Sequence, residues 1–159
     1  MSGASDGKIW HIPSIDLPFN FVNLGARPGR ILDIKLLCYK LEDRNFKKPK
    51  FDFKALWCVN TIEFNKKHSN RFEWISNAVE SDWLPFFILN GQPVNKHVIL
   101  ETPGRWDEFP NDDYIAKLLI KSDEQREWKE VQKFRLELKE RWVSDEMKNG
   151  SSFGLAIIN

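Results

Sequence analysis

The chain has 159 residues, a length that suits one domain whose core needs neither a metal nor a disulfide. Its residues are 42% hydrophobic and 30% charged, as in globular proteins, and no apolar run of about 18 residues predicts a membrane-spanning helix. The N-terminus has no apolar segment typical of a signal peptide, so we expect an intracellular, cytoplasmic protein. The formal net charge of +1, taken alone, predicts no polyanionic partner.

The first 30 residues differ in character from the rest. We expect residues 1–30 to form a flexible tail and a Pro/Gly-rich arm, and residues 31–159 to form a single domain. Apolar anchors of the arm, together with a tryptophan in a later Pro/Gly-rich loop, are candidates for a self-association interface. They are Trp10, Ile12, Ile15, Phe19, Phe21 and Trp106. The alternative is that these side chains pack back onto the chain's own domain.

Alternation of apolar and polar residues predicts several strands. Residues 31–41 place alternate residues on one face: Leu32, Ile34, Leu36 and Cys38. Residues 51–64 fit a strand better than a helix, and residues 114–121 form a strand with Lys117 and Lys121 on one face. Asn90-Gly91 predicts a tight turn that joins the strands on either side of it as a hairpin.

Two segments predict helices. Asn70 can cap a helix over residues 70–84. Ser122 can cap a longer helix, with an apolar stripe at Trp128, Val131, Phe134, Leu138 and Trp142, that ends at Asn149-Gly150. Residues 153–158 predict a final strand. The sequence therefore predicts an α+β fold with a mainly antiparallel sheet and two principal helices.

Few residues are arranged for catalysis or metal binding. Cys38 and Cys58 lie in apolar runs and are expected to be buried thiols, with a disulfide as the alternative. The three histidines are isolated, and no zinc-ligand spacing is present, so we expect no metal site and no cofactor. The acidic loop from Asp107 to Asp113 lacks EF-hand spacing; it is either a solvated loop or a weak divalent-cation site.

Charge is unevenly distributed along the chain. Residues 44–71 hold eight lysines and arginines against two carboxylates, whereas residues 72–113 hold eight carboxylates against two cations. If the two basic runs in the first block fold together, they form a polyanion-binding surface made of Arg44, Lys47, Lys48, Lys50, Lys66, Lys67 and Arg71. The alternative is that RNFKKPKFDFK is only a hairpin loop and a strand, a reading that gives every residue except Phe46 a structural role.

The order of several stretches carries a resemblance to a known family. These stretches are ILDIKLLCYK, RNFKKPKFDF, NRFEWISNAVESDW, NKHVILE, YIAKLLIKSDE and SSFGLAIIN, within residues 30–158. Their order resembles that of the short matrix proteins of plant rhabdoviruses. The resemblance implies a non-enzymatic virion protein that self-associates and bridges an anionic membrane and the nucleocapsid, with basic loops facing lipid or ribonucleoprotein.

We therefore expect a structural or interaction protein rather than an enzyme, and the resemblance alone implies that it is a viral matrix protein. Its expected partners are other copies of itself and an anionic membrane surface or ribonucleoprotein, with no small-molecule substrate. The first alternative is a small RNA-binding viral accessory protein, such as a silencing or defence suppressor. The second is a small enzyme or inhibitor with a pocket formed by His97, Cys58 and the Asp107–Asp113 loop.

Overall fold

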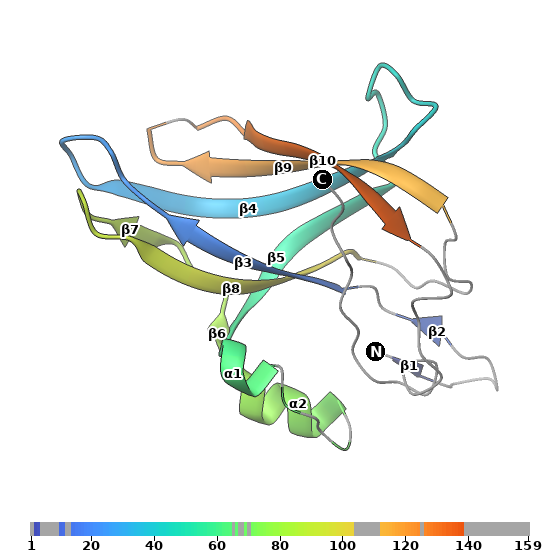
Figure 1. Cartoon of the computed structure of the whole chain (residues 1–159), viewed down its shortest axis with the longest axis horizontal. Coiled ribbons are helices and arrows are strands. Elements are labelled where there is room, and N and C mark those ends of the chain that lie inside the picture. Colours follow the sequence, from blue (N-terminus) through green and yellow to red (C-terminus); the bar gives the residue numbers. More distant parts are fainter. Residues whose placement is uncertain are drawn as a thin grey trace.

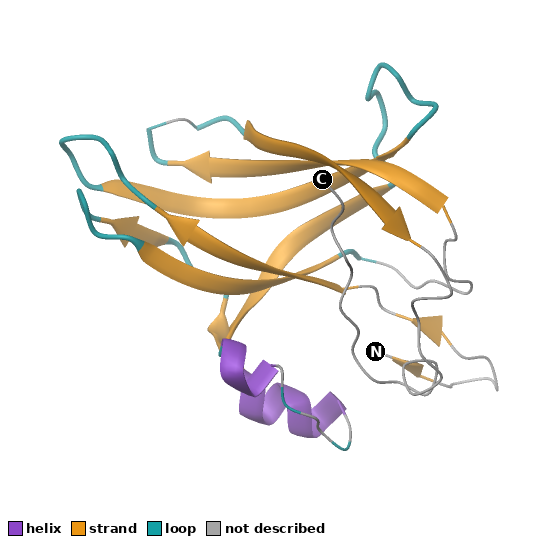
Figure 2. Cartoon of the chain, viewed as in Figure 1, coloured by secondary structure: helices purple, strands orange, loops and turns teal. Residues whose placement is uncertain are grey.

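The computed structural model shows a chain built mainly of antiparallel β-sheet (Figures 1 and 2). It describes residues 2–3, 10–11, 14–64, 66, 69, 71–103, 112–124 and 126–138. The main sheet contains β3 (Ser14–Phe21), β4 (Gly29–Lys40), β5 (Phe51–Val59), β6 (Val79–Asp82), β7 (Phe86–Ile88), β8 (Val94–Glu101), β9 (Asp112–Ser122) and β10 (Lys129–Leu138). A separate pair is formed by β1 (Ser2–Gly3) and β2 (Trp10–His11).

The main sheet has the strand order β10-β9-β4-β5-β8-β3, with β6 added beside β5 and β7 beside β4. It curls into a half-barrel, and the two short helices, α1 (Thr61–Phe64) and α2 (Arg71–Ala78), lie together at one corner (Figure 1). The expectation of an α+β fold with two principal helices is therefore wrong. β3 belongs to the segment expected as an arm, and it pairs with β8 along its whole length.

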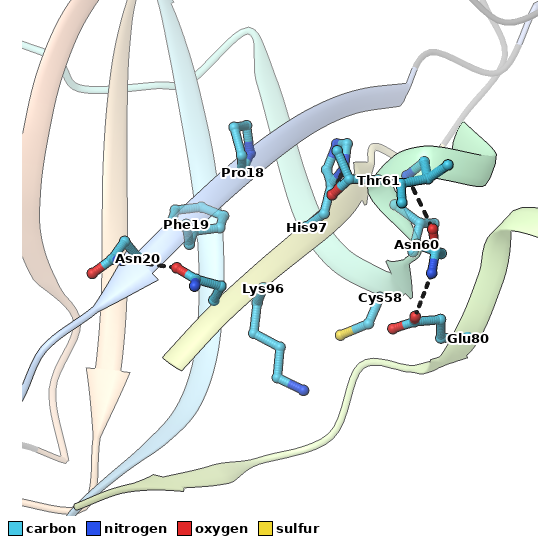
Figure 3. Close-up of a pocket in the computed structure, with 12 residues that line it drawn as sticks. Pro18, Phe19, Asn20, Cys58, Asn60, Thr61, Glu80, Lys96 and His97 are labelled. Atoms are coloured by element: carbon cyan, nitrogen blue, oxygen red, sulfur yellow. Dashed lines mark hydrogen bonds between the residues drawn. The ribbon is translucent and has the colours of Figure 1, made fainter. Parts of the chain in front are cut away.

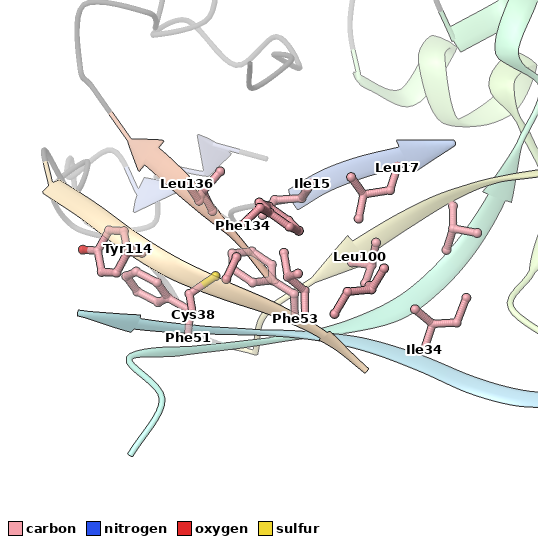
Figure 4. Close-up of a cluster of buried hydrophobic side chains, with 14 of the residues drawn as sticks. Ile15, Leu17, Ile34, Cys38, Phe51, Phe53, Leu100, Tyr114, Phe134 and Leu136 are labelled. Carbon is pink, nitrogen blue, oxygen red and sulfur yellow. The ribbon is translucent and has the colours of Figure 1, made fainter. Parts of the chain in front are cut away.

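The inner face of the curled sheet holds one continuous hydrophobic core (Figure 4). The edge strands β3 and β10 both contribute to it, through Ile15 and Leu17 on one side and Phe134 and Leu136 on the other. Phe53 lies at its centre and is 1% exposed. Because the sheet curls, a single layer of strands can bury its apolar face without helices packed across it.

A β-bulge in β4 changes which residues face this core. The register with β9 shifts between Ile31 and Asp33, which leaves Leu32 as the extra residue. Ile31 is buried before the bulge and Ile34 after it, whereas Leu32 is only partly buried. The alternation predicted for this strand was therefore right from Ile34 onward and wrong for Leu32, because one inserted residue reverses the side on which alternate side chains point.

A smaller cluster lies on the outer face, where the helices cover β5 and β8. Val59, Ala78 and Ile99 are its buried members. α1 starts after Asn60, whose side-chain oxygen accepts hydrogen bonds from the amides of Ile62 (3.0 Å) and Glu63 (3.1 Å). This cap explains why the strand predicted over residues 51–64 stops at Val59.

The other sequence expectations had mixed outcomes. The strands predicted at 31–41 and 114–121 are present as β4 and β9. The helix predicted at 70–84 ends at Ala78, because Val79 pairs with Val59 and starts β6. The hairpin predicted around Asn90-Gly91 is wrong, since β7 pairs with β4 while β8 pairs with β3 and β5.

The largest error concerns the long helix predicted after Ser122. Residues 129–138 form β10 instead, antiparallel to β9. Phe134 and Leu136, two positions apart, both enter the core, whereas Val131 lies at a register shift and is largely exposed. The predicted end of that helix and the strand at 153–158 fall outside the described residues. In the part of the chain that the structure describes, no helix is long and apolar enough to cross a membrane.

Candidate functional site

The candidate interface residues of the N-terminal segment are mostly used within the chain itself. Ile15 and Phe21 are buried in the core, and Phe19 packs against that core while stacking on Phe21, with 5.4 Å between the ring centroids. The side chain of Trp10 and the residues Ile12 and Trp106 lie outside what the structure describes.

The two basic runs lie at opposite ends of β5. Residues 44–50 belong to the β4–β5 connection, whereas residues 65–70 lie between α1 and α2 (Figure 1). A strand of nine residues separates them by about 26 Å. Lys66 forms an ion pair with Glu63 at 2.5 Å, while Lys67 and the Arg71 side chain are outside the described residues. The described residues thus divide the predicted surface rather than assembling it.

The β4–β5 connection places an aromatic ring on the outer face of the sheet. Phe46 has a φ of 49°, a left-handed conformation that is uncommon for a bulky residue. Its ring makes an edge-on contact with the buried Tyr39 ring, at 5.3 Å between centroids. Asp43 holds the connection by accepting long hydrogen bonds from the backbone amides of Lys47 (3.5 Å) and Lys48 (3.4 Å).

Two lysines from neighbouring strands converge on this ring. The ammonium groups of Lys117 on β9 and Lys133 on β10 lie 4.0 Å and 4.5 Å from the Phe46 centroid. The two residues are directly opposite each other in the β9–β10 register. Exposed cations of the adjoining connection extend this surface, which we name the lysine–aromatic patch: Tyr39, Arg44, Phe46, Lys47, Lys48, Lys50, Lys117 and Lys133.

A second opposed pair lies further along the same face. Lys35 on β4 and Lys54 on β5 are cross-strand partners. The Lys35 ammonium lies 4.3 Å from the centroid of Trp128. Carboxylates offset part of this charge, above all Glu130, whose oxygen is 3.0 Å from the Lys117 nitrogen. The outer face therefore combines rows of cations with aromatic rings and retains positive charge around Phe46.

Sequence reasoning found half of this patch. It identified Arg44, Lys47, Lys48 and Lys50 and singled out Phe46 as unexplained. It missed Lys133, because residues 129–138 were read as helix, and it did not connect Lys117 with the loop. The period-two pattern Lys133, Arg135 and Glu137 against Phe134 and Leu136 was the available signal.

A pocket of about 570 Å³ lies where the sheet forks (Figure 3). β5 pairs with β8 as far as Cys58, opposite Val98, while its other edge pairs with β6 from Trp57 to Val59. The first residues of β8 pair with β3 alone among the described strands. His97 lies in this pocket, with Nε2 3.1 Å from Asp16 Oδ2 and Nδ1 3.2 Å from Thr61 Oγ1.

The polar groups of the pocket hold elements of the fold together, and its cysteine is not activated as a nucleophile. A carboxylate only accepts hydrogen bonds, so His97 donates from Nε2 to Asp16, and its Nδ1 shares a hydrogen bond with the Thr61 hydroxyl. Burial raises the pKa of the Cys58 thiol, and the nearby Lys96 and a hydrogen bond with Ser81 oppose this only in part. Cys58 thus stays a protonated thiol. The hydrogen bonds of His97 connect β3 with α1.

The described residues of the acidic loop, Asp112 and Asp113, do not line this pocket. Asp112 and Asp113 begin β9; Asp113 bonds to Arg135, and Asp112 lies 3.8 Å from the Lys40 ammonium. Asp107 is outside the described residues. Within those that are described, no group of histidine, cysteine and carboxylate side chains is arranged to hold a metal ion. Both cysteines are buried and unbridged, as the sequence predicted.

Comparison with protein-family models, with curated proteins and with solved structures gave no match.

Proposed function

We propose that this chain is a non-enzymatic RNA-binding protein that holds the phosphate backbone of single-stranded RNA on its lysine–aromatic patch. The observation that carries the proposal is the directly opposed pair Lys117 and Lys133 above Phe46. Like charges that face each other across two strands destabilise a sheet. Glu130 pairs with Lys117 and offsets part of this charge. The remaining departure from a local folding rule is expected at functional sites, where a ligand can supply further countercharge.

Of the partners expected from the sequence, RNA fits this surface better than a lipid bilayer. Lys117 and Lys133 alternate with the buried residues Ala116, Leu118 and Phe134, so they lie on the outer side of the sheet, whose curl Figure 1 shows. A flexible phosphodiester chain can follow a convex surface, whereas a flat bilayer meets it over a small area. The Phe46 ring is only partly exposed, because it lies under two lysines and against Tyr39, so little of it can enter lipid.

The geometry also predicts the mode of binding. The rings of Phe46 and Trp128 have lysine ammonium groups against them, so we expect contacts to phosphates rather than stacking of bases. Binding should then be independent of base sequence and weaken steeply with salt, because each phosphate contact releases counterions.

The test is fluorescence anisotropy of a labelled oligouridylate over a salt series. We expect Lys117→Glu/Lys133→Glu to weaken binding by at least about tenfold and to lower the salt slope by about 0.7 for each lost contact. The matched pair of single variants is Lys133→Glu and Lys66→Glu, each of which reverses one charge. Lys133→Glu should weaken binding, whereas Lys66→Glu, at the other end of β5, should leave affinity unchanged.

Two results would count against the proposal. One is equal weakening by Lys133→Glu and by Lys66→Glu, which would mean that only net charge matters. The other is wild-type affinity in a folded Lys117→Glu/Lys133→Glu variant, with the fold checked by circular dichroism and thermal unfolding. Binding of anionic vesicles that is lost only in the patch variant would reassign the patch to a membrane.

A further inference from the structure

Two connections meet at the end of the sheet opposite the β4–β5 connection (Figure 1). They are residues 22–28, between β3 and β4, and residues 89–93, between β7 and β8. Asn23 joins them: it forms a parallel bridge with Asn90, and its side-chain amide donates to the carbonyl oxygens of Arg27 (2.7 Å) and Ile88 (3.0 Å). The turn at Gly91, with φ of 70°, donates from its amide to the Asn23 carbonyl oxygen.

This end of the sheet exposes large apolar side chains. Leu24, on the first connection, is 91% exposed, and Phe87, on β7, is 63% exposed; Val22 and Leu89, on the two connections, are exposed as well. We name Val22, Leu24, Phe87 and Leu89 the apolar tip. Single exposed apolar residues are ordinary, but several on two joined connections indicate a surface that is covered in use.

The two connections of the tip carry positive charge. Residues 22–30 and 87–93 contain Arg27 and Arg30 and no carboxylate. Arg30 pairs with Phe87 across β4 and β7, and its guanidinium lies 5.4 Å from the ring centroid. The β9–β10 connection lies at the same end of the sheet (Figure 1) and carries Arg126 and the carboxylates of Asp123, Glu124 and Glu127. Asp123 accepts a hydrogen bond from the Arg30 backbone amide at 3.1 Å, so this acidic connection borders the base of the tip.

We propose that the apolar tip inserts into the interface of an anionic lipid bilayer. Apolar side chains enter the boundary between headgroups and acyl chains, while adjacent arginines contact lipid phosphates. The tip suits this partner because Leu24 projects almost fully into solvent and the one charged residue on the two connections, Arg27, is a cation. The Asn23 bonds hold the two connections together, so little conformational freedom is lost on insertion.

The tip and the lysine–aromatic patch are far apart. β4 runs from one to the other, and its 12 residues span about 36 Å. A bilayer that holds the tip therefore leaves the patch open to RNA. The tip proposal stands on its own residues and does not require the RNA proposal to be right.

The experiment is co-sedimentation of the full chain with vesicles of phosphatidylcholine, with and without phosphatidylserine. We expect Leu24→Glu and Phe87→Glu each to weaken binding by about tenfold or more, since each removes the burial of one large apolar side chain. Ile62→Glu is the matched control, because Ile62 is 71% exposed on α1 at another corner. Arg27→Glu should reduce the preference for phosphatidylserine by about fivefold or more.

The variants distinguish insertion of the tip from general charge attraction and from dimerisation. Loss of vesicle binding in the two tip variants, with wild-type binding by Ile62→Glu and by Lys117→Glu/Lys133→Glu, supports the proposal. Absence of vesicle binding by the wild type overturns it, as does equal loss in all variants. A wild-type dimer that the tip variants convert to monomer, without vesicle binding, also overturns it and assigns the tip to a second copy of the chain.

Discussion

The inner and outer faces of the sheet differ in the kind of side chains that they bring together. The inner face buries one continuous set of apolar side chains, from Ile15 on one edge strand to Leu136 on the other. The outer face places lysine opposite lysine, at Lys117–Lys133 and Lys35–Lys54, and spreads aromatic rings beneath them. The difference teaches that the inner face accounts for folding, whereas the outer face contains arrangements that folding alone does not favour.

The largest expected effect of a single change lies on the inner face. Phe53→Ala should lower the free energy of unfolding by about 3–5 kcal/mol, because it opens a cavity where the side chain is 1% exposed. Urea unfolding followed by circular dichroism measures this. At a temperature where the variant stays folded, its RNA affinity should match the wild type. A loss of affinity in the folded variant would show that the two faces are not separate.

The second-largest effect should come from alkaline pH, which lowers the free energy of unfolding through two groups on the inner face. Burial raises the pKa of the Cys38 thiol and of the Tyr114 hydroxyl to about 12 each. Above pH 9 the Cys38 thiol loses its proton in the unfolded state but keeps it in the folded state. The unfolded state then binds fewer protons, so the free energy of unfolding falls as the pH rises toward 12. Tyr114 adds to this fall above pH 10.

The expected slope reaches about 1.4 kcal/mol per pH unit for each group. Unfolding midpoints measured from pH 7 to pH 11 should stay level at first and fall beyond pH 9. The Cys38→Ala variant starts from lower stability and should show a shallower fall. A steep fall below pH 9 would contradict this assignment, since both groups keep their protons in both states there.

Replacement of the outer-face ring should have a small effect on stability. Phe46→Gly loses contacts with Lys117 and Lys133 but relieves a left-handed φ of 49°, so the net change should stay within about 1 kcal/mol. RNA affinity should fall several-fold, because the lysines lose the ring that positions them. Thermal unfolding and anisotropy measure the two effects. A destabilisation above about 2 kcal/mol would place Phe46 in a structural core instead.

The sequence predicted the parts of the sheet whose alternation is regular. β9 and most of β4 follow a strict period of two, and the predicted start of a strand at Phe51 is right. The bulge at Leu32 could not be read from the sequence, because the extra residue is set by pairing with β9. β10 was missed because Trp128, Val131, Phe134 and Leu138 also fit a helical stripe, and only a neighbouring strand decides between the two.

The candidate sites depend even more on tertiary structure. The lysines and Phe46 of the patch come from three separate parts of the chain, and the apolar tip joins connections 65 residues apart through Asn23 and Ile88. Lys66 does not lie near Lys47, because β5 separates two connections that are close in sequence. The charge excess predicted a basic surface, but only the strand order shows which lysines face each other.

The most direct test of the central claim compares unfolding midpoints with and without RNA. Lys117→Thr/Lys133→Thr removes an opposed pair of like charges, but it also removes the Lys117–Glu130 ion pair and the lysine contacts with Phe46, so without RNA its stability should lie within about 1 kcal/mol of the wild type. With RNA at about 100 times the wild-type dissociation constant, the wild type should gain about 2.7 kcal/mol and the variant much less. A larger gain for the wild type is the predicted result. Equal gains would contradict the claim that these lysines serve RNA binding.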